Sequence, residues 1–279
     1  MSYKVIIDSC GELTEDMKAS GHFTSAPLSM DVDQYHFVDD DTFDQQEFLR
    51  RVKESPNCPK SACPSPEFYQ KCFEEDYDHI YAVTLSAALS GSYNSAMTAR
   101  GMVLEDHPDK KIYVFDSKSA SIGETLIGRR IAELEEQGLS FEDVVSRVED
   151  YISGQVTWFV LESLDTLRKN GRLSNFQAIV ASALKIKPIC SSTEDGQIQQ
   201  AGQARGINKA LVKMVEMAAE SSDHTQDKEI AVSHVNNPER GRMVLEALKE
   251  RIPAKNYILE NGRGCTSMYS GDGGIIVVL

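Results

Sequence analysis

Residues 85–96, Leu-Ser-Ala-Ala-Leu-Ser-Gly-Ser-Tyr-Asn-Ser-Ala, have the composition of an anion-binding turn. Residues 79–85 are apolar and β-branched, which predicts a buried strand, and residues 94–103 carry apolar side chains at helical spacing. Where a strand leads into a helix, unpaired N–H groups and hydroxyls point toward one place, and the helix dipole adds positive charge there. Ser90 and the amide of Gly91 are therefore candidate anion ligands. Alternatively, Ser90 or Ser92 only caps the helix.

A second serine-rich turn lies at residues 60–66, Lys-Ser-Ala-Cys-Pro-Ser-Pro. Ser65 fits the N-cap and Pro66 the first position of a helix at 67–73, which leaves Ser61 upstream on a loop. In an α/β sheet such turns gather at the carboxyl edge of the strands, where ligands bind. We therefore expect Ser61 and Ser90 to approach the same ligand.

The segment Lys169-Asn-Gly-Arg172 is a candidate for recognition of phosphate or carboxylate. Gly171 fits the left-handed end of a short helix at 164–169, and this conformation directs Arg172 outward at a fixed angle. A guanidinium held in this way can bind a carboxylate or phosphate with two parallel hydrogen bonds. The alternative is a surface arginine that pairs with a nearby glutamate.

Other chemistries have weaker support. The chain has no G-x-S-x-G elbow and no P-loop. A serine hydrolase built on Ser90 or Ser92 would need a histidine, and His234 at the end of a predicted strand is better interpreted as structural. Asp8 and Asp116 follow strands, and we interpret them as turn residues that bond local backbone. We assign no catalytic residue, no metal ligand and no cofactor.

Three adjacent aspartates at residues 39–41 resemble a metal cluster. Three consecutive carboxylates cannot all face one ion from a strand, so the run is expected to be solvated. Asp41 or Thr42 is then the cap of a helix at residues 43–54.

Composition excludes several classes of protein. The net charge of −14 argues against nucleic acid and against an anionic membrane surface as partners. The six cysteines form no C-x-x-C pair, which argues against zinc and favours reduced thiols. The N-terminus lacks the apolar core of a signal peptide, and the apolar run at 275–279 is too short to span a bilayer. We expect a cytoplasmic protein that is not embedded in a membrane.

The order of elements predicts an α/β fold with two domains. In residues 1–154, strands at 3–7, 23–30, 79–85 and 111–115 alternate with helices, which indicates a parallel sheet covered by helices on both faces. Residues 155–279 form an α+β domain with a mixed or antiparallel sheet, because Asp195-Gly196 signals a hairpin. Helices are expected there at 176–184, 208–220 and 238–251. The stripe Leu211, Met214, Val215 and Ala218 is expected to be core.

Taken together, the motifs resemble those of the DegV family of bacterial fatty-acid-binding proteins. The matching pieces are Asp8-Ser9, residues 60–66, residues 85–96, Asp116-Ser117, Leu164–Ser174, Lys185–Pro188 and a glycine-rich C-terminus. Each motif is weak alone, but together they follow the family's order over nearly the whole chain. The resemblance implies a non-enzymatic carrier that binds a long-chain fatty acid between its domains and presents the carboxylate to a fatty acid kinase. The alternatives are a serine-based lipid or ester hydrolase and a small phospho-ligand binder.

The resemblance also implies roles for particular residues. Ser61, Ser90 and Gly91 would bind the fatty acid carboxylate, and Arg172 would lie near it and assist phosphoryl transfer or partner contact. Where the family has a histidine that approaches the lipid head, this chain has Tyr269. A phenol stays neutral to a pH near 10, so Tyr269 can donate a hydrogen bond but supplies no charge. We therefore expect lipid binding with little pH dependence between about pH 6 and 8.

Overall fold

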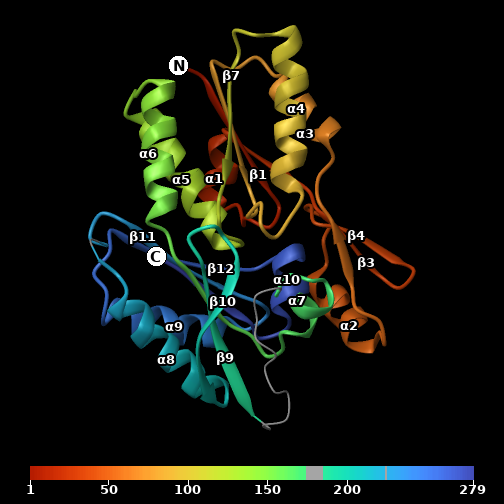
Figure 1. The fold of residues 1–279 in the computed structure, drawn as a ribbon, viewed down its shortest axis with the longest axis vertical. Helices are drawn as coiled ribbons and strands as arrows, with labels where there is room; N and C mark the ends of the chain where they lie inside the picture. Colours follow the sequence, from red (N-terminus) through yellow and green to blue (C-terminus); the bar gives the residue numbers. More distant parts are fainter. Residues whose placement is uncertain (174–184, 224) are drawn as a thin grey trace.

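A computed structural model describes residues 1–173, 185–223 and 225–279. The helix expected at residues 176–184 lies outside the described residues. Two sheets are arranged along the long axis of the molecule, with helices around each of them (Figure 1). Every strand of the first sheet precedes residue 154, and every strand of the second follows it.

The first sheet is parallel and has four strands in the order β2-β1-β6-β7, as predicted. Val5 and Ile7 face α5 and α6, whereas Ile6 between them faces α3 and α4. Because helices cover both faces, β1 and β6 are buried along their whole length and are apolar for most of it. The bounds are β1 (Tyr3–Asp8), β2 (Phe23–Ala26), β6 (His79–Thr84), β7 (Lys111–Asp116), α1 (Glu15–Ser20), α3 (Pro66–Phe73), α4 (Ser92–Asp106), α5 (Ile122–Glu136) and α6 (Phe141–Ser153).

A separate three-stranded antiparallel sheet has the order β4-β3-β5 and comprises β3 (Ser29–Val32), β4 (Tyr35–Val38) and β5 (Lys60–Ala62). The single strand expected at residues 23–30 was therefore wrong. Pro27 lies between β2 and β3, and each of these strands joins a different sheet, because proline cannot donate a ladder hydrogen bond. Ser61 lies on β5 and pairs with Met30, so its expected position on a loop was also wrong.

The prediction that the aspartate run at residues 39–41 is solvated was wrong for Asp39. Asp39 is buried, and its carboxylate accepts the N–H groups of Gly264 and Cys265 at 2.9 and 2.8 Å. It thereby satisfies two free donors at the start of α10 (Gly264–Ser270). The cap of α2 (Gln45–Glu54) is Asp44, whose carboxylate accepts the N–H of Glu47, and neither Asp41 nor Thr42 has this role.

The second sheet has six strands in the order β10-β9-β8-β13-β11-β12, and only the pair β11–β12 is parallel. One face packs on α8 and α9, and the stripe from Leu211 to Ala218 is buried there, as expected for core. The bounds are β8 (Thr157–Val160), β9 (Ile186–Ser192), β10 (Ile198–Arg205), β11 (Glu229–His234), β12 (Asn256–Asn261), β13 (Ile275–Val278), α7 (Asp165–Lys169), α8 (Ile207–Glu220) and α9 (Pro238–Lys249).

The other face of the second sheet meets the first half of the chain through α5. Ile122 and Leu126 of α5 form one buried cluster with Phe159 of β8 and Ile276 of β13. The N-terminal end of α5 therefore lies where the two halves join, and the side chains near it can contact a molecule held between them.

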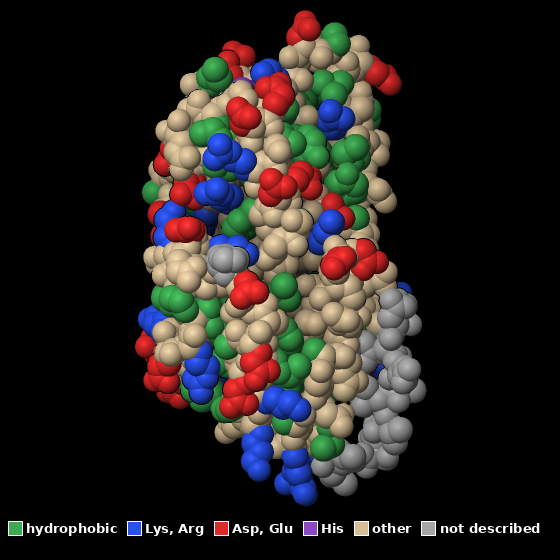
Figure 2. Space-filling model, turned by 60° about the vertical axis from the view of Figure 1, so that its left-hand side comes forward, with side chains coloured by type: hydrophobic (Ala, Val, Ile, Leu, Met, Phe, Trp, Pro, Cys, Tyr) green, Lys and Arg blue, Asp and Glu red, His purple; other side chains and the backbone are tan. Residues whose placement is uncertain are grey.

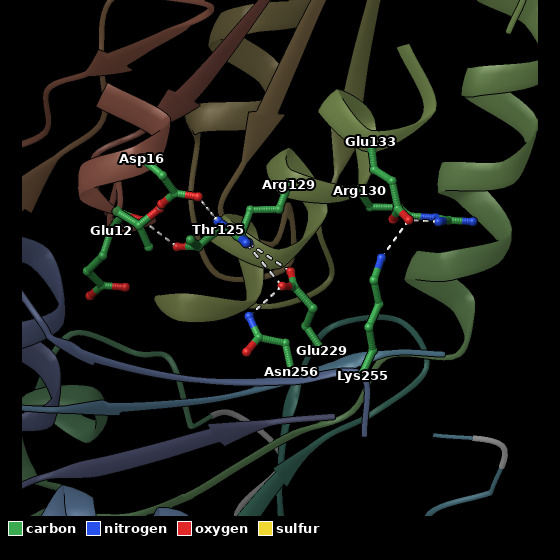
Figure 3. A network of polar contacts seen from close by, with 10 residues as sticks. Glu12, Asp16, Thr125, Arg129, Arg130, Glu133, Glu229, Lys255 and Asn256 are labelled. Carbon is green, nitrogen blue, oxygen red and sulfur yellow. Dashed lines mark hydrogen bonds and ion pairs between the residues drawn. The ribbon is translucent and has the colours of Figure 1, made fainter. Parts of the chain in front are cut away.

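Polar contacts along α5 also join the halves (Figure 3). Arg129 of α5 donates to both carboxyl oxygens of Glu229 on β11, at 2.8 and 3.1 Å, and it also bonds Asp16 of α1. The side chains of Arg129 and Glu229 are only 22% and 18% exposed. Lys255 forms a second link, at 2.6 Å, to Glu133.

We expect Arg129→Met to lower the free energy of unfolding by about 2–3 kcal/mol, because it removes charge-assisted hydrogen bonds and leaves Glu229 without its cation. Urea denaturation measures the effect. Arg50→Met is the matched control, since the ion pairs of Arg50 are exposed and lie within α2; we expect it to cost about 0.5 kcal/mol or less. Equal losses in the two variants would contradict the importance of the interdomain pair.

On the face shown in Figure 2, acidic and basic side chains are interspersed rather than gathered by sign. The net charge of −14 is therefore not concentrated on this face as one acidic patch. In the part of the chain that the structure describes, no helix is long and apolar enough to cross a membrane.

Candidate functional site

The carboxyl ends of β1, β6 and β7 meet at the serine-rich turn. Asp8 accepts the N–H of Leu85 at 2.8 Å, and Asp116 accepts the N–H of Ala87 at 2.9 Å. Each aspartate also accepts an N–H two residues further along the chain, which is the turn role expected of these residues. The turn between β6 and α4 is therefore attached to both neighbouring strands through buried or half-buried carboxylates.

The second serine-rich turn lies directly against the first. Ser65 caps α3 and Pro66 begins it, as predicted. The hydroxyl of Ser95 on α4 donates to the carbonyl of Pro64 at 2.5 Å. A Cβ atom on Gly91 would lie 3.4 Å from the Cys63 sulfur. The two turns are thus neighbours in space, although the first begins at residue 85 and the second at residue 60.

Ser61, Tyr269 and Arg172 come together from three separate parts of the chain. The hydroxyls of Ser61 and Tyr269 are 2.9 Å apart, although the residues are 208 positions apart in sequence. The Arg172 guanidinium lies 5.9 Å from the centre of the Tyr269 ring, and its Nε donates to the carbonyl of Leu89 at 3.1 Å. Gly171 has φ +77°, as predicted for the residue that ends the helix and orients Arg172. Among the described residues, Arg172 has no carboxylate partner.

Ser90 and Gly91 occupy the turn itself. The Ser90 hydroxyl accepts the N–H of Ser92 at 3.2 Å, which is the local role considered as the alternative. Gly91 is exposed and immediately precedes α4. Neither residue lines the apolar cavity described below, whereas the adjacent Leu89 does. A direct bond from Ser90 or Gly91 to a ligand therefore stays a prediction.

An apolar cavity lies between the two halves of the chain, and Arg172 and Tyr269 are among the residues that line it. Its polar lining residues include Arg172, Tyr269, Lys118, Ser121 and Thr266. Its volume is about 90 Å³, less than the ~150 Å³ of an apolar cavity that holds benzene, so a long acyl chain requires the walls to move apart. The apolar residues of its wall come from both halves of the chain and are Leu85, Leu89, Ala120, Phe159, Leu161, Leu167, Ile198 and Ile276.

The β9–β10 hairpin closes one side of the cavity. Its turn at Asp195-Gly196 was predicted from the sequence, and Gly196 has φ +75°. The Ser86 hydroxyl donates to the Gly196 carbonyl at 2.8 Å, so the hairpin touches the first serine-rich turn. A Cβ on Gly196 would lie 2.8 Å from the Cα of Lys118, so only glycine allows this close approach.

Buried acids near the cavity are the feature that sequence reasoning missed. Glu12 is 3% exposed, and its carboxyl accepts the hydroxyls of Ser121 at 3.1 Å and Thr266 at 2.9 Å. In Figure 3 its carboxyl group points away from the Arg129 network, so that network gives it no cation. Burial raises the pKa of Glu12 to about 8, although the bonds from Thr266 and Ser121 act in the opposite direction.

Glu12 changes the expected pH dependence. Burial raises the pKa of the Tyr269 phenol above its ordinary value, so Tyr269 itself stays neutral. Glu12, however, loses its proton near pH 8, and the hydroxyls that bond it line the cavity. The prediction of little pH dependence considered only Tyr269. With Glu12 included, affinity for an anion should begin to fall as the pH approaches 8.

The hydrogen bonds of Ser92 and His234 are structural and do not join the two residues into a catalytic pair. The Ser92 hydroxyl bonds the Tyr69 hydroxyl at 2.9 Å, and both residues are buried. His234 accepts the N–H of Asn237 at 3.3 Å, next to the start of α9. In the described part of the chain, no histidine bonds Ser90 or Ser92.

The fold and cavity define a class of two-domain α/β protein with an apolar site between the domains. The DegV family model, described as an uncharacterised protein family, matches residues 2–279. A DegV domain-containing protein of Streptococcus pneumoniae is 33% identical, and the match covers 99% of this chain and 98% of that protein. This chain belongs to the DegV family.

Solved structures of the family resemble the whole chain. A DegV protein of Ruminococcus gnavus with vaccenic acid is 48% identical, with a TM-score of 0.97 and complete coverage of both chains. The Streptococcus pneumoniae fatty acid kinase (Fak) B3 protein, loaded with linoleic acid, is 32% identical, with a TM-score of 0.88 and coverage of 100% of this chain and 99% of that one. These relatives carry fatty acids as ligands.

Proposed function

We propose that this protein binds a long-chain fatty acid between its two domains, residues 1–154 and 155–279, and presents the carboxylate to a fatty acid kinase. The observation that carries the proposal is an apolar cavity between the two halves that Arg172 and Tyr269 line, with Ser61 bonded to Tyr269. Relatives of the same fold that hold fatty acids support it. The protein would act in the cytoplasm, and the kinase rather than this chain would transfer the phosphoryl group.

Magnitudes indicate how the two ends of the ligand would contribute. Burial of about fifteen carbons of a C16 chain at ~0.8 kcal/mol each supplies ~12 kcal/mol before costs. Association and ordering then remove several kcal/mol. Each hydrogen bond to the charged head contributes ~1.5–3 kcal/mol. The tail therefore supplies most of the affinity, and the polar residues determine where the head lies.

Lipid extraction from the purified protein, followed by mass spectrometry, tests the proposal. We expect a copurified long-chain fatty acid. Turnover of an ester substrate would instead favour a serine hydrolase, and bound phosphate without lipid would favour a phospho-ligand binder. The kinase step is tested separately by incubation with ATP and a fatty acid kinase catalytic subunit, which should produce acyl phosphate.

Replacement of Ser61 or Ser90 by alanine should weaken fatty acid binding by about tenfold to a hundredfold, from ~1.5–3 kcal/mol per lost bond. Isothermal titration calorimetry of the lipid-free protein measures the change. Ser65→Ala is the control, because Ser65 caps α3 and only the stability of that helix should suffer. Unchanged affinity in both single variants and in the double variant would remove these residues from the site.

The Tyr269→Phe variant distinguishes the contribution of the Tyr269 hydroxyl to ligand binding from the contribution of ring packing. The ring is partly buried against apolar clusters of both halves of the chain, and this packing is retained in the variant. If the hydroxyl also donates to the ligand, affinity should fall by about tenfold. An unchanged affinity would leave Tyr269 a packing role alone.

A further inference from the structure

Glu124, in the first turn of α5, is a fully buried acid without an evident hydrogen-bond donor. Its relative exposure is 0%, and neither carboxyl oxygen has a donor among the described residues. The titratable groups that interact with it include five that are neutral or negatively charged: Asp8 on β1, Cys10 and Glu12 after β1, Tyr69 on α3 and Cys265 on α10. An ionised carboxylate in such a place would be very unfavourable.

Asp8 is also fully buried, but it has donors. Its carboxylate accepts the N–H of Leu85 at 2.8 Å and the N–H of Cys10 at 3.2 Å, and it interacts with the Ser92 hydroxyl. Donors of this kind stabilise the ionised form of a carboxyl group. If one of the two acids is ionised, it is therefore Asp8.

The carboxyl groups of Asp8 and Glu124 are both fully buried and interact with each other. Gly11 permits the approach, because a Cβ atom there would lie 2.8 Å from the Cβ of Glu124. Two interacting carboxyl groups that are fully buried do not both ionise readily, so we assign one shared proton to the pair. A proton on Glu124, donated to Asp8, gives a partner to one of the two Glu124 oxygens that otherwise lack one.

We propose that Glu124 is a positioning residue for the ligand head: as a neutral acid it donates its proton to Asp8, and this acid pair fixes the serine-rich turn. Asp8 accepts the N–H of Leu85 at the start of that turn and interacts with Ser92 at its end. Ser90 and Gly91 lie between these points. The role rests on the proposed binding of a fatty acid.

The titration behaviour of the pair agrees with this geometry. Burial, followed by the nearby Asp8 and Cys10, raises the pKa of Glu124 well above its ordinary value. Burial also raises the pKa of Asp8, but the bonds from Glu124, Ser92 and Leu85 oppose that rise. The proton therefore belongs on Glu124, and the pair carries one negative charge below the turn instead of two.

Infrared spectroscopy and binding test the proposal together. At pH 7, the wild-type protein should show the C=O stretch of a protonated carboxylic acid that E124Q lacks. Glutamine still donates an N–H to Asp8, so E124Q should bind vaccenic acid within about threefold of wild type. Leucine cannot donate, so E124L should bind at least about tenfold more weakly. The rescue by glutamine distinguishes the proton donor from a space-filling side chain.

Glu135→Gln is the matched control, because Glu135 is buried on the same helix but bonds His79 and Tyr81, away from the turn; its affinity should equal that of wild type. Wild-type affinity in E124L would overturn the positioning role, and identical infrared spectra of wild type and E124Q would overturn the proton on Glu124. If E124L does not fold, the infrared spectra of wild type and E124Q still test the proton on Glu124, and the affinity of E124Q still tests whether an N–H donor to Asp8 is sufficient. If wild-type protein binds no fatty acid, the proposed function and the positioning role both fail, while the infrared comparison still decides the acid pair.

Discussion

The free energy of unfolding of the wild-type protein is expected to fall as the pH rises from about 5 to 8, and the Glu12→Gln variant is expected not to show this fall. The folded-state pKa of Glu12 is raised to about 8 from an ordinary value of 4.5. Above pH 4.5 the unfolded chain releases this proton, whereas the folded protein keeps it. Stability from this group is therefore complete below pH 4.5 and is lost as the pH rises through 8, by on the order of 5 kcal/mol.

Urea denaturation at pH 5, 6, 7 and 8 measures this difference. The variant should be more stable than wild type at pH 8, since its amide oxygen can still accept the hydroxyls of Ser121 and Thr266 without a buried charge. Glu15→Gln is the control, because Glu15 is exposed on the neighbouring helix and pairs only with Lys18. Parallel pH profiles for wild type and Glu12→Gln would show that Glu12 is not held neutral.

The Arg172→Ala variant is expected to keep most of its bound lipid but to lose acyl phosphate formation by about a hundredfold or more. A guanidinium stabilises charge that develops on a phosphoryl group during transfer, and this effect exceeds its contribution to ground-state binding. In this structure Arg172 bonds the backbone carbonyls of Leu89 and Asn170. Its charge is not neutralised by a carboxylate in the described part of the chain.

Copurified lipid and acyl phosphate are measured on the same preparation, with ATP and a fatty acid kinase catalytic subunit. Arg168→Ala is the matched control, because Arg168 is exposed on α7 and pairs with Asp165; it should transfer at the wild-type rate. Arg172→Lys keeps the charge but not the planar fork, so partial activity would show that geometry matters. A normal rate in Arg172→Ala would refute a role in transfer.

Local chemistry was sufficient for much of the fold. The cap at Ser65, the proline that begins α3 and the left-handed Gly171 were predicted from residue types, because each satisfies a backbone requirement within a few positions. The parallel first sheet was also predicted, since a strand buried on both faces needs side chains that are apolar on both. Pro27 separates β2 from β3, but the residues on either side of it have the composition of one continuous strand, so the sequence pattern alone predicts a single strand.

Only the tertiary structure decided which distant residues meet. The Ser61–Tyr269 bond, the burial of Asp39 at the start of α10 and the contact of Glu12 with Thr266 each join positions more than 200 residues apart. Their spacing carries no period, so nothing local distinguishes them from surface residues. For the same reason Glu124 looks like an ordinary first-turn glutamate in the sequence. The proton that we propose on Glu124 depends on its burial beside Asp8, and tertiary packing rather than local sequence determines that burial.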